Sequence, residues 1–250
     1  MANRFYQPGD ERGAKVNDLF SKIAPRYDLI NDLQSFGLHR YWKRRLLKLA
    51  NVKPGERALD VCCGTGDISF GLAKLGADVV GLDFSEAMLR VAKERDVEAV
   101  FDRRSSEKIT DGHRPSLQFM EGDAQNLPFE NAEFEIVTMG YGLRNLPSWE
   151  RGLEEMFRVA KPGGRILVLD FGKPDNSLLR KIYFGYLRWF VPLFGKIFCG
   201  DSATYAYILE SLKNYPAQRG VAEKMQKLEC KGSRVINFLG GVMSINYGEK

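Results

Sequence analysis

Histidine and cysteine are scarce in this 250-residue sequence, which contains two histidines and four cysteines. The cysteines are Cys62, Cys63, Cys199 and Cys230. They form no Cys-x-x-Cys pair and no Cys/His ligand spacing, so we expect no metal site. Cys62 and Cys63 are adjacent at the end of a predicted buried strand, which favours reduced thiols in the cytosol over a disulfide.

Long apolar runs are also absent. The most apolar stretch, residues 182–199, is interrupted by Arg188, Pro192 and Lys196. A membrane-spanning helix needs about 20 unbroken apolar residues. Charged residues such as Arg4 and Asp10 stand where a signal peptide would have its apolar core. We therefore predict a cytoplasmic protein without a membrane-spanning helix.

The charge balance is only mildly basic, with a net charge of +5. Such a surface can meet nucleic acid or anionic lipid, but a solvated face is the more frequent explanation, and we expect no nucleic-acid partner. The composition, 44% hydrophobic and 28% charged, predicts one globular domain over residues 1–250. Within it we expect an N-terminal helical segment (1–50), a cofactor-binding core (51–175), and a helical cap with a terminal hairpin (176–250).

Strand and helix patterns alternate through the core, which predicts an α/β fold with a parallel sheet between two layers of helices. The predicted strands are 57–62, 78–82, 117–121, 134–140 and 165–171, and the predicted helices are 67–75, 85–95 and 149–160. Two helices separated by a break at Pro25 precede the sheet, and residues 96–116 are predicted to form a surface loop. Helices at 178–190, 204–214 and 221–228 and a hairpin of 233–238 with 242–247 complete the chain.

The turn after the first strand carries the strongest functional signal. Gly64 and Gly66 let the backbone approach a ligand, and Asp83 ends the second strand, where nucleotide-binding folds hold a ribose diol. The third glycine of a dinucleotide fingerprint is missing, and Asp67 would repel a pyrophosphate. A cofactor with a ribose but no phosphate fits better, namely S-adenosylmethionine, whose positive charges suit Asp60 and Asp67. A tight turn without a ligand is the alternative.

Two more stretches follow later strands at the same sheet edge. Asp123, in Gly122-Asp123-Ala124, can accept a hydrogen bond from an adenine amino group, although a plain turn could contain the same residues. Arg144 and Asn145 follow the fourth strand, where they could hold an oxyanion or position a water. Alternatively, Arg144 pairs with a surface carboxylate and Asn145 caps the next helix.

With these motifs, the chain resembles the ubiquinone/menaquinone biosynthesis C-methyltransferase family over nearly its whole length. The matching stretches are residues 20–28, 31–32, 39–43, 59–67, 122–124, 142–145, 161–165, 202–211 and 240–241. The resemblance implies a class I S-adenosylmethionine-dependent methyltransferase sheet, Rossmann-like, with N-terminal helices and a C-terminal helical cap. It also implies cofactor contacts at Thr65, Asp83, Asp123, Ala124 and Gly140.

Three features depart from the family pattern. Gly140 is often serine in relatives, so this chain offers backbone but no hydroxyl there. Cys62 and Cys63 stand where relatives often have Ala-Gly, and we interpret them as small side chains that fill the turn. Asn246 replaces a histidine found in many relatives, so a histidine base at that position is not available.

The resemblance implies methyl transfer from S-adenosylmethionine to a ring carbon of a polyprenylated hydroquinone. Demethylmenaquinol is the favoured acceptor, and 2-methoxy-6-polyprenyl-1,4-benzoquinol is the alternative. Another small molecule, such as a sterol or polyketide, an RNA substrate and a non-catalytic scaffold are weaker hypotheses. Because ionising a quinol hydroxyl activates the adjacent carbon, we expect Arg144 with Asn145 to stabilise the phenolate, directly or through an activated water.

Tyr27 and Tyr141 are predicted to line the substrate cavity, with Tyr205 and Tyr207 at its mouth, although core packing explains all four equally well. A polyprenyl tail lies in the bilayer, so we expect peripheral contact with the inner face of the membrane. Residues 182–199 would then form an interfacial helix, and a lid packed on the sheet is the alternative. A homodimer is the assembly we consider.

Overall fold

A computed structural model describes residues 12–24, 27–106, 115–193, 196 and 203–250, with backbone only at 14, 98–106 and 203–206. The strands are β1 (Arg57–Val61), β2 (Asp78–Asp83), β3 (Leu117–Glu121), β4 (Phe134–Gly140), β5 (Ala160–Phe171), β6 (Lys231–Phe238) and β7 (Met243–Glu249). They form one sheet in the order β3-β2-β1-β4-β5-β7-β6. The strands β1 to β5 run parallel, and β7 is antiparallel to both β5 and β6. The predicted parallel sheet and terminal hairpin are confirmed.

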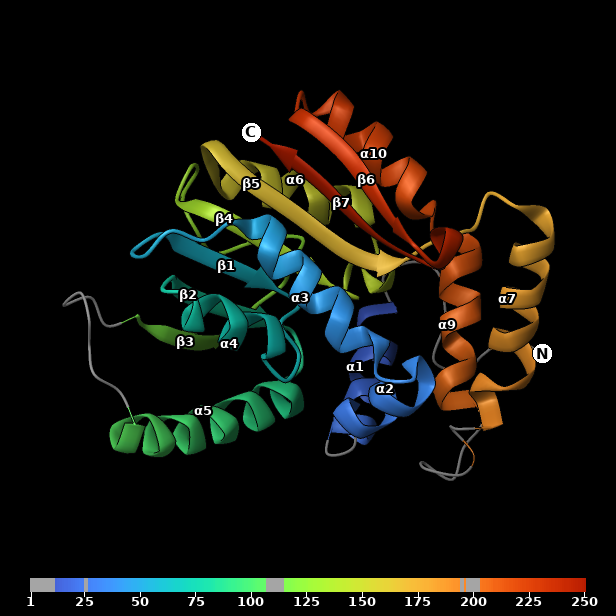
Figure 1. The fold of residues 1–250 in the computed structure, drawn as a ribbon, viewed down its shortest axis with the longest axis horizontal. Coiled ribbons are helices and arrows are strands. Elements are labelled where there is room, and N and C mark those ends of the chain that lie inside the picture. The colour runs from blue at the N-terminus through green and yellow to red at the C-terminus, as the bar shows by residue number, and fades with distance from the viewer. Residues whose placement is uncertain (1–11, 25–26, 107–114, 194–195, 197–202) are drawn as a thin grey trace.

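Helices cover both faces of this sheet and one of its ends (Figure 1). They are α1 (Arg12–Ile23), α2 (Tyr27–Ser35), α3 (Leu38–Ala50), α4 (Asp67–Lys74), α5 (Glu86–Ser106), α6 (Trp149–Val159), α7 (Ser177–Trp189), α9 (Ala203–Asn214) and α10 (Ala217–Lys227). Helices α3 and α4 lie on one face, and α6 and α10 lie on the other. Helices α1, α2, α7 and α9 gather where the parallel strands end, so they enclose the edge at which the predicted site residues lie.

The alternation of side chains along β5 explains the two layers. Val168 belongs to the core cluster that contains α6 and α10, whereas Leu169 belongs to the cluster that contains α3 and α4. Both residues are at most 1% exposed. Because successive side chains of a strand point to opposite faces, a continuous apolar strand of this kind is buried on both sides.

Two sequence predictions about the helices are corrected. The N-terminal segment contains three helices, because Phe36 (φ 52°) and Gly37 (φ 74°) both adopt left-handed backbone conformations between α2 and α3. The loop predicted at 96–116 is wrong over its first half, since α5 continues to Ser106. Residues 96–106 contain neither glycine nor proline, so nothing in the sequence ends the helix there. Residues 107–114 lie outside the described ranges.

The fifth strand begins earlier than predicted. Ala160 already pairs with Phe134, and an irregular register follows before Arg165 pairs with Ile136. Gly163, with φ 77°, lies within this irregular stretch and accounts for the turn that its sequence suggests. The change lengthens β5 at its start and leaves its carboxyl end, where the site lies, as predicted.

Candidate active site

The glycine turn after β1 is held by the aspartate at the end of β2. The backbone N–H of Gly64 donates to Asp83 Oδ2 at 2.7 Å, and the N–H of Ser85 donates to Oδ1 at 2.8 Å. Burial raises the pKa of Asp83, although these backbone bonds oppose the shift. Gly64 has φ 57°, and a Cβ built there would meet no atom within 4 Å. The turn is therefore open toward a ligand at Gly64.

Asp60, predicted to bind the cofactor, lies behind this turn. It is 1% exposed, and its carboxylate accepts hydrogen bonds from Ser69 Oγ at 2.6 Å and Thr138 Oγ1 at 2.9 Å. Burial raises the pKa of Asp60 to about 6, and the two hydroxyls only partly offset this shift. Through these hydrogen bonds Asp60 connects β1 to α4 and β4, and it supports the glycine turn from its buried side.

Asp67, at the start of α4, is neutralised by two cations. Its carboxylate lies 2.6 Å from Lys43 Nζ and 2.7 Å from Arg95 Nη2. Burial alone would raise the pKa of Asp67, but these two cations outweigh it and lower the pKa to about 2. Lys43 and Arg95 therefore compensate the negative charge of Asp67 within the protein. They reduce the attraction between Asp67 and a cationic cofactor that the sequence suggested.

Thr65 is covered by the N-terminal helices. It is 3% exposed, and its hydroxyl donates to Asp28 of α2 at 3.0 Å. Arg95 of α5 donates to the Thr65 carbonyl at 2.7 Å and contacts Asp28 at 3.2 Å. Helices α2 and α5 thus meet over the glycine turn, an arrangement that the sequence did not indicate.

The other predicted cofactor residues lie at the ends of β3 and β4. Asp123 is exposed, and its Oδ1 accepts a hydrogen bond from the N–H of Gln125 at 2.8 Å, while Ala124 is buried beside it. A Cβ added at Gly140 would lie 2.5 Å from Ile68 Cδ1. The space that a serine side chain would occupy in relatives is therefore filled here by Ile68 of α4.

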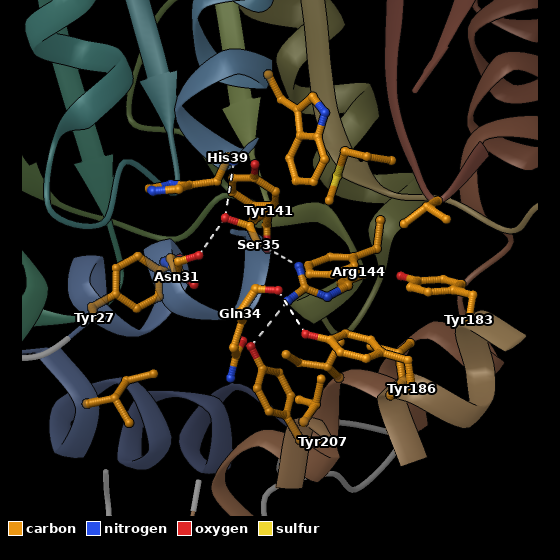
Figure 2. A pocket seen from close by; sticks show the side chains of 18 residues that line it. Tyr27, Asn31, Gln34, Ser35, His39, Tyr141, Arg144, Tyr183, Tyr186 and Tyr207 are labelled. Carbon is orange, nitrogen blue, oxygen red and sulfur yellow. Dashed lines mark hydrogen bonds between the residues drawn. The ribbon is translucent and has the colours of Figure 1, made fainter. Parts of the chain in front are cut away.

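An aromatic cavity adjoins this edge of the sheet (Figure 2), with a volume of about 760 Å³ that includes space open to solvent. It is lined by Ile23, Tyr27, Asn31, Gln34, Ser35, His39, Trp42, Tyr141, Arg144, Phe171, Tyr183, Tyr186, Leu187, Val191, Tyr207, Ile208, Val242 and Met243. The structure thus brings the predicted Tyr27 and Tyr141 together with Arg144. Tyr207 also faces the cavity, whereas the side chain of Tyr205 lies outside the described residues.

Arg144 is the one cation that lines this cavity in the described part of the chain. It is 3% exposed and pairs with Asp170 at the end of β5, with 2.9 Å between Nη1 and Oδ1. Its Nη2 donates to the Tyr207 hydroxyl at 3.2 Å, and its guanidinium lies 4.5 Å from the ring centre of Phe171. Burial opposes the charge, but Asp170, Tyr207 and Tyr27 together outweigh burial and raise the pKa of Arg144, so it stays cationic.

Asn145, predicted to act with Arg144, lies just outside the cavity. It is 6% exposed, does not line the cavity, and donates from Nδ2 to the Tyr141 carbonyl at 3.2 Å. The alternative that Asn145 caps the next helix is wrong, because Ser148 is the N-cap of α6 and accepts from the N–H of Arg151. Asn145 therefore stabilises the backbone conformation of Tyr141, whose φ is 62°.

The sequence model of the ubiE/COQ5 methyltransferase family matches residues 9–250. This chain belongs to that family. It is 38% identical to the ubiquinone/menaquinone biosynthesis C-methyltransferase of Ectopseudomonas mendocina, over 97% of this chain and 91% of the relative. It is also 38% identical to the demethylmenaquinone methyltransferase of Desulfitobacterium hafniense, over 97% and 92% of the two chains.

Solved structures show the same fold. A SAM-dependent methyltransferase from Aquifex aeolicus superposes with a TM-score of 0.57 at 18% identity, covering 83% of this chain and 88% of the other. The predicted class I methyltransferase fold is therefore confirmed, and the chain is an S-adenosylmethionine-dependent methyltransferase.

The residues at the sheet edge fit S-adenosylmethionine. Gly64 leaves open space where a Cβ would otherwise project, and Asp83, although bonded to two backbone N–H groups, keeps lone pairs for a ribose diol. Asp123 presents an exposed carboxylate at the end of the next strand. We expect these three residues, with the backbone of Gly140, to hold the cofactor.

Sequence reasoning missed several residues in the cavity and behind its wall. Asp170, which pairs with Arg144 but does not line the cavity, was not predicted, although an acidic residue at the carboxyl end of a buried parallel strand is a signal that could have identified it. Tyr183 and His39 carried no such signal, because they come from helices α7 and α3 that reach the cavity only in the folded protein. The hydroxyl of Tyr183 points toward Arg144 and has no hydrogen-bond partner among the described residues (Figure 2).

Proposed function

We propose that this methyltransferase transfers a methyl group from S-adenosylmethionine to a ring carbon of a polyprenylated hydroquinone, with demethylmenaquinol as the acceptor. The observation that carries this proposal is a buried arginine in an aromatic cavity beside the cofactor edge. A flat quinol ring fits among tyrosine and phenylalanine side chains, and its oxygen can meet the guanidinium. The name of the D. hafniense relative supports the menaquinone precursor.

Arg144 supplies the electrostatic part of the reaction. When bound, S-adenosylmethionine supplies an electrophilic methyl group. A phenol has a pKa near 10, so ionisation of the quinol hydroxyl needs stabilisation of the resulting oxyanion. Arg144 keeps its charge although it is buried, and a fixed cation in a buried site stabilises an oxyanion more strongly than it would in solvent.

The tyrosines of the cavity act as donors in this arrangement. Burial raises the pKa of Tyr27, Tyr183 and Tyr207 above the ordinary value for tyrosine, so these hydroxyls stay protonated. The hydroxyl of Tyr183 has no partner in the described structure and is free to donate to a ligand oxygen. Tyr183 and Tyr207 lie beside Arg144, so they place hydroxyl groups next to its guanidinium (Figure 2).

The acceptor is identified by incubating the protein with labelled S-adenosylmethionine and either reduced demethylmenaquinone or the reduced methoxy-benzoquinone, both with short tails. We expect label to enter demethylmenaquinol. Label only in the benzoquinol would favour the alternative acceptor, which the name of the E. mendocina relative also includes. Label in neither quinol would refute the proposed function. The matched Arg144→Ala variant should bind cofactor normally but lose turnover.

We further propose that the protein meets the membrane through the outer face of α7 and the end of α2. Leu178, Ile182 and Trp189 are 66%, 62% and 70% exposed, and their spacing places them on one side of the helix. The opposite side buries Tyr183 and Leu187. A helix that is apolar on an exposed side as well as on its buried side is typical of an interfacial helix.

The positive charge of α7 also favours contact with the membrane. The helix contains Arg180, Lys181 and Arg188 and no acidic residue. Basic side chains beside exposed aromatic residues suit the anionic surface of a bilayer. No helix within the described ranges is long and apolar enough to cross a bilayer.

The exposed apolar side chains lie at the rim of the cavity. We define the rim as Phe36 at the end of α2 with Trp189 and Phe190 at the end of α7, which are 82%, 70% and 60% exposed. The two helix ends are joined by a hydrogen bond from the Tyr186 hydroxyl to the Gln34 carbonyl at 2.8 Å, and both of these residues line the cavity (Figure 2). A lipid tail could therefore pass from the bilayer into the cavity between them.

Flotation with phosphatidylglycerol vesicles tests this contact. We expect wild-type protein to float and a Trp189→Asp/Phe190→Asp variant to remain at the bottom of the gradient. The matched control is Leu75→Asp, which charges an apolar side chain of similar exposure (47%) at the far end of α4 and should float like the wild type. Absence of binding by the wild-type protein would refute the membrane proposal.

A further inference from the structure

Ionisation of the quinol hydroxyl needs a proton acceptor, and the structure contains a group suited to this role. We propose that His39, oriented by Asp32, is the proton acceptor for the quinol hydroxyl. The inference rests on the proposed function, because it assigns a residue to a step of that same reaction.

A buried histidine, His39, and a partly exposed aspartate, Asp32, form a dyad at the wall of the cavity. His39 lies in the first turn of α3, is 4% exposed and lines the cavity. Its Nε2 is 2.7 Å from Asp32 Oδ1 on α2. Its Nδ1 is buried and has no hydrogen-bond partner in the described part of the chain. Since a carboxylate accepts from Nε2–H, this arrangement leaves the lone pair on Nδ1.

The turn between α2 and α3 fixes the dyad. The backbone N–H of His39 donates to Ser35 Oγ at 3.2 Å (Figure 2). Arg40 Nε donates to Asp32 at 2.8 Å, and Arg40 and His39 together lower the pKa of Asp32, which keeps it ionised. A histidine held by an ionised aspartate with its second nitrogen free is the arrangement of a general base.

The other ionisable groups near the cavity cannot take this role. Arg144 is a cation and carries no lone pair for a proton. The buried tyrosines Tyr27 and Tyr207 keep their protons, because burial raises the pKa of each. Asp170 does not line the cavity, and its carboxylate already accepts from the side chain and backbone of Arg144 and from the N–H of Phe171.

Burial and a neighbouring cation keep His39 neutral at pH 7. Burial and Lys43 of α3 lower its pKa, and they outweigh Asp32 of α2 and Asp67 of α4, which act in the opposite direction. A neutral imidazole can accept a proton, and its lone pair is then available at physiological pH.

The proposed step balances in atoms and charge. The quinol hydroxyl gives its proton to His39 Nδ1, and Arg144 stabilises the resulting oxyanion. The activated ring carbon then forms a bond to the methyl group as the methyl–sulfur bond breaks. The methylated carbon loses its hydrogen as a proton to solvent, and His39 returns its proton to the ring oxygen. One proton is released in total, and the base is regenerated.

Turnover of short-tailed demethylmenaquinol and ¹⁵N NMR of the free protein test the proposal together. We expect His39→Ala to lower kcat by about 10²–10⁴-fold, the range typical of a general base, and added imidazole to restore part of this loss. The other histidine in the sequence provides the matched control, and His113→Ala should keep wild-type kcat. The wild-type pH profile should have an acidic limb below the ordinary histidine pKa of about 6.5.

The NMR measurement does not depend on activity. With only two histidines, ¹⁵N labelling gives two imidazole spin systems, and the His39→Ala spectrum assigns them. We expect a neutral ring with the proton on Nε2. Wild-type kcat in a folded His39→Ala protein, a proton on Nδ1, or failure of imidazole to rescue would overturn the proposal. If the wild-type protein itself does not methylate the quinol, the proposed function fails and the NMR result still decides the state of His39.

Discussion

Removal of Asp170 should strongly destabilise the protein, because it leaves the Arg144 charge buried without its partner. Both side chains are 3% exposed, and their charged atoms are 2.9 Å apart. Breaking such a buried pair from one side costs about 3–5 kcal/mol. At roughly 2–4 °C per kcal/mol for a protein of this size, Asp170→Ala should lower Tm by roughly 6–20 °C.

A double variant separates stability from activity. Arg144→Met combined with Asp170→Leu replaces the pair by apolar side chains, which in other buried pairs is neutral or stabilising by about 1–4 kcal/mol. We therefore expect the double variant to regain most of the free energy of unfolding, measured by urea denaturation, while methyl transfer stays abolished. A loss below about 1 kcal/mol for Asp170→Ala, or a double variant no more stable than the single one, would refute this account of the pair.

The remaining predictions concern residues at and behind the edge of the sheet that carries the glycine turn. Burial raises the pKa of Asp60 to about 6, so the folded state binds its proton more tightly than the unfolded state, and stability should fall as pH rises from about 4 to 6. Asp60→Asn should remove this fall and be more stable than wild type at pH 7 by up to roughly 3 kcal/mol, as urea unfolding at several pH values will show. Gly140→Ser should cost about 1–3 kcal/mol, because its Cβ would lie 2.5 Å from Ile68 Cδ1, and a paired Ile68→Ala should recover part of the loss in thermal unfolding. Gly185→Ser, where a Cβ meets no atom within 4 Å, is the control and should leave Tm nearly unchanged.

Local patterns were sufficient for the fold and for the cofactor edge. The alternation of strands and helices predicted the parallel sheet, because a strand buried on both faces has a continuous apolar sequence. Gly64 and Asp83 were identified from the turn and the strand end that carry them. The same reasoning did not reveal the hydrogen bonds of Asp60 to Ser69 and Thr138, because the direction of a side chain at a strand end depends on the helix and strand packed beside it.

The sequence by itself determined that this protein has a methyltransferase sheet, a glycine turn open to a cofactor, and an arginine after the fourth strand. Only the tertiary structure decided what surrounds that arginine. Asp170, Tyr207 and His39 come from β5, α9 and α3, which are far apart in the chain and meet only when the helices close over the sheet edge. Contacts over such separations depend on packing between elements, and no local residue pattern encodes them.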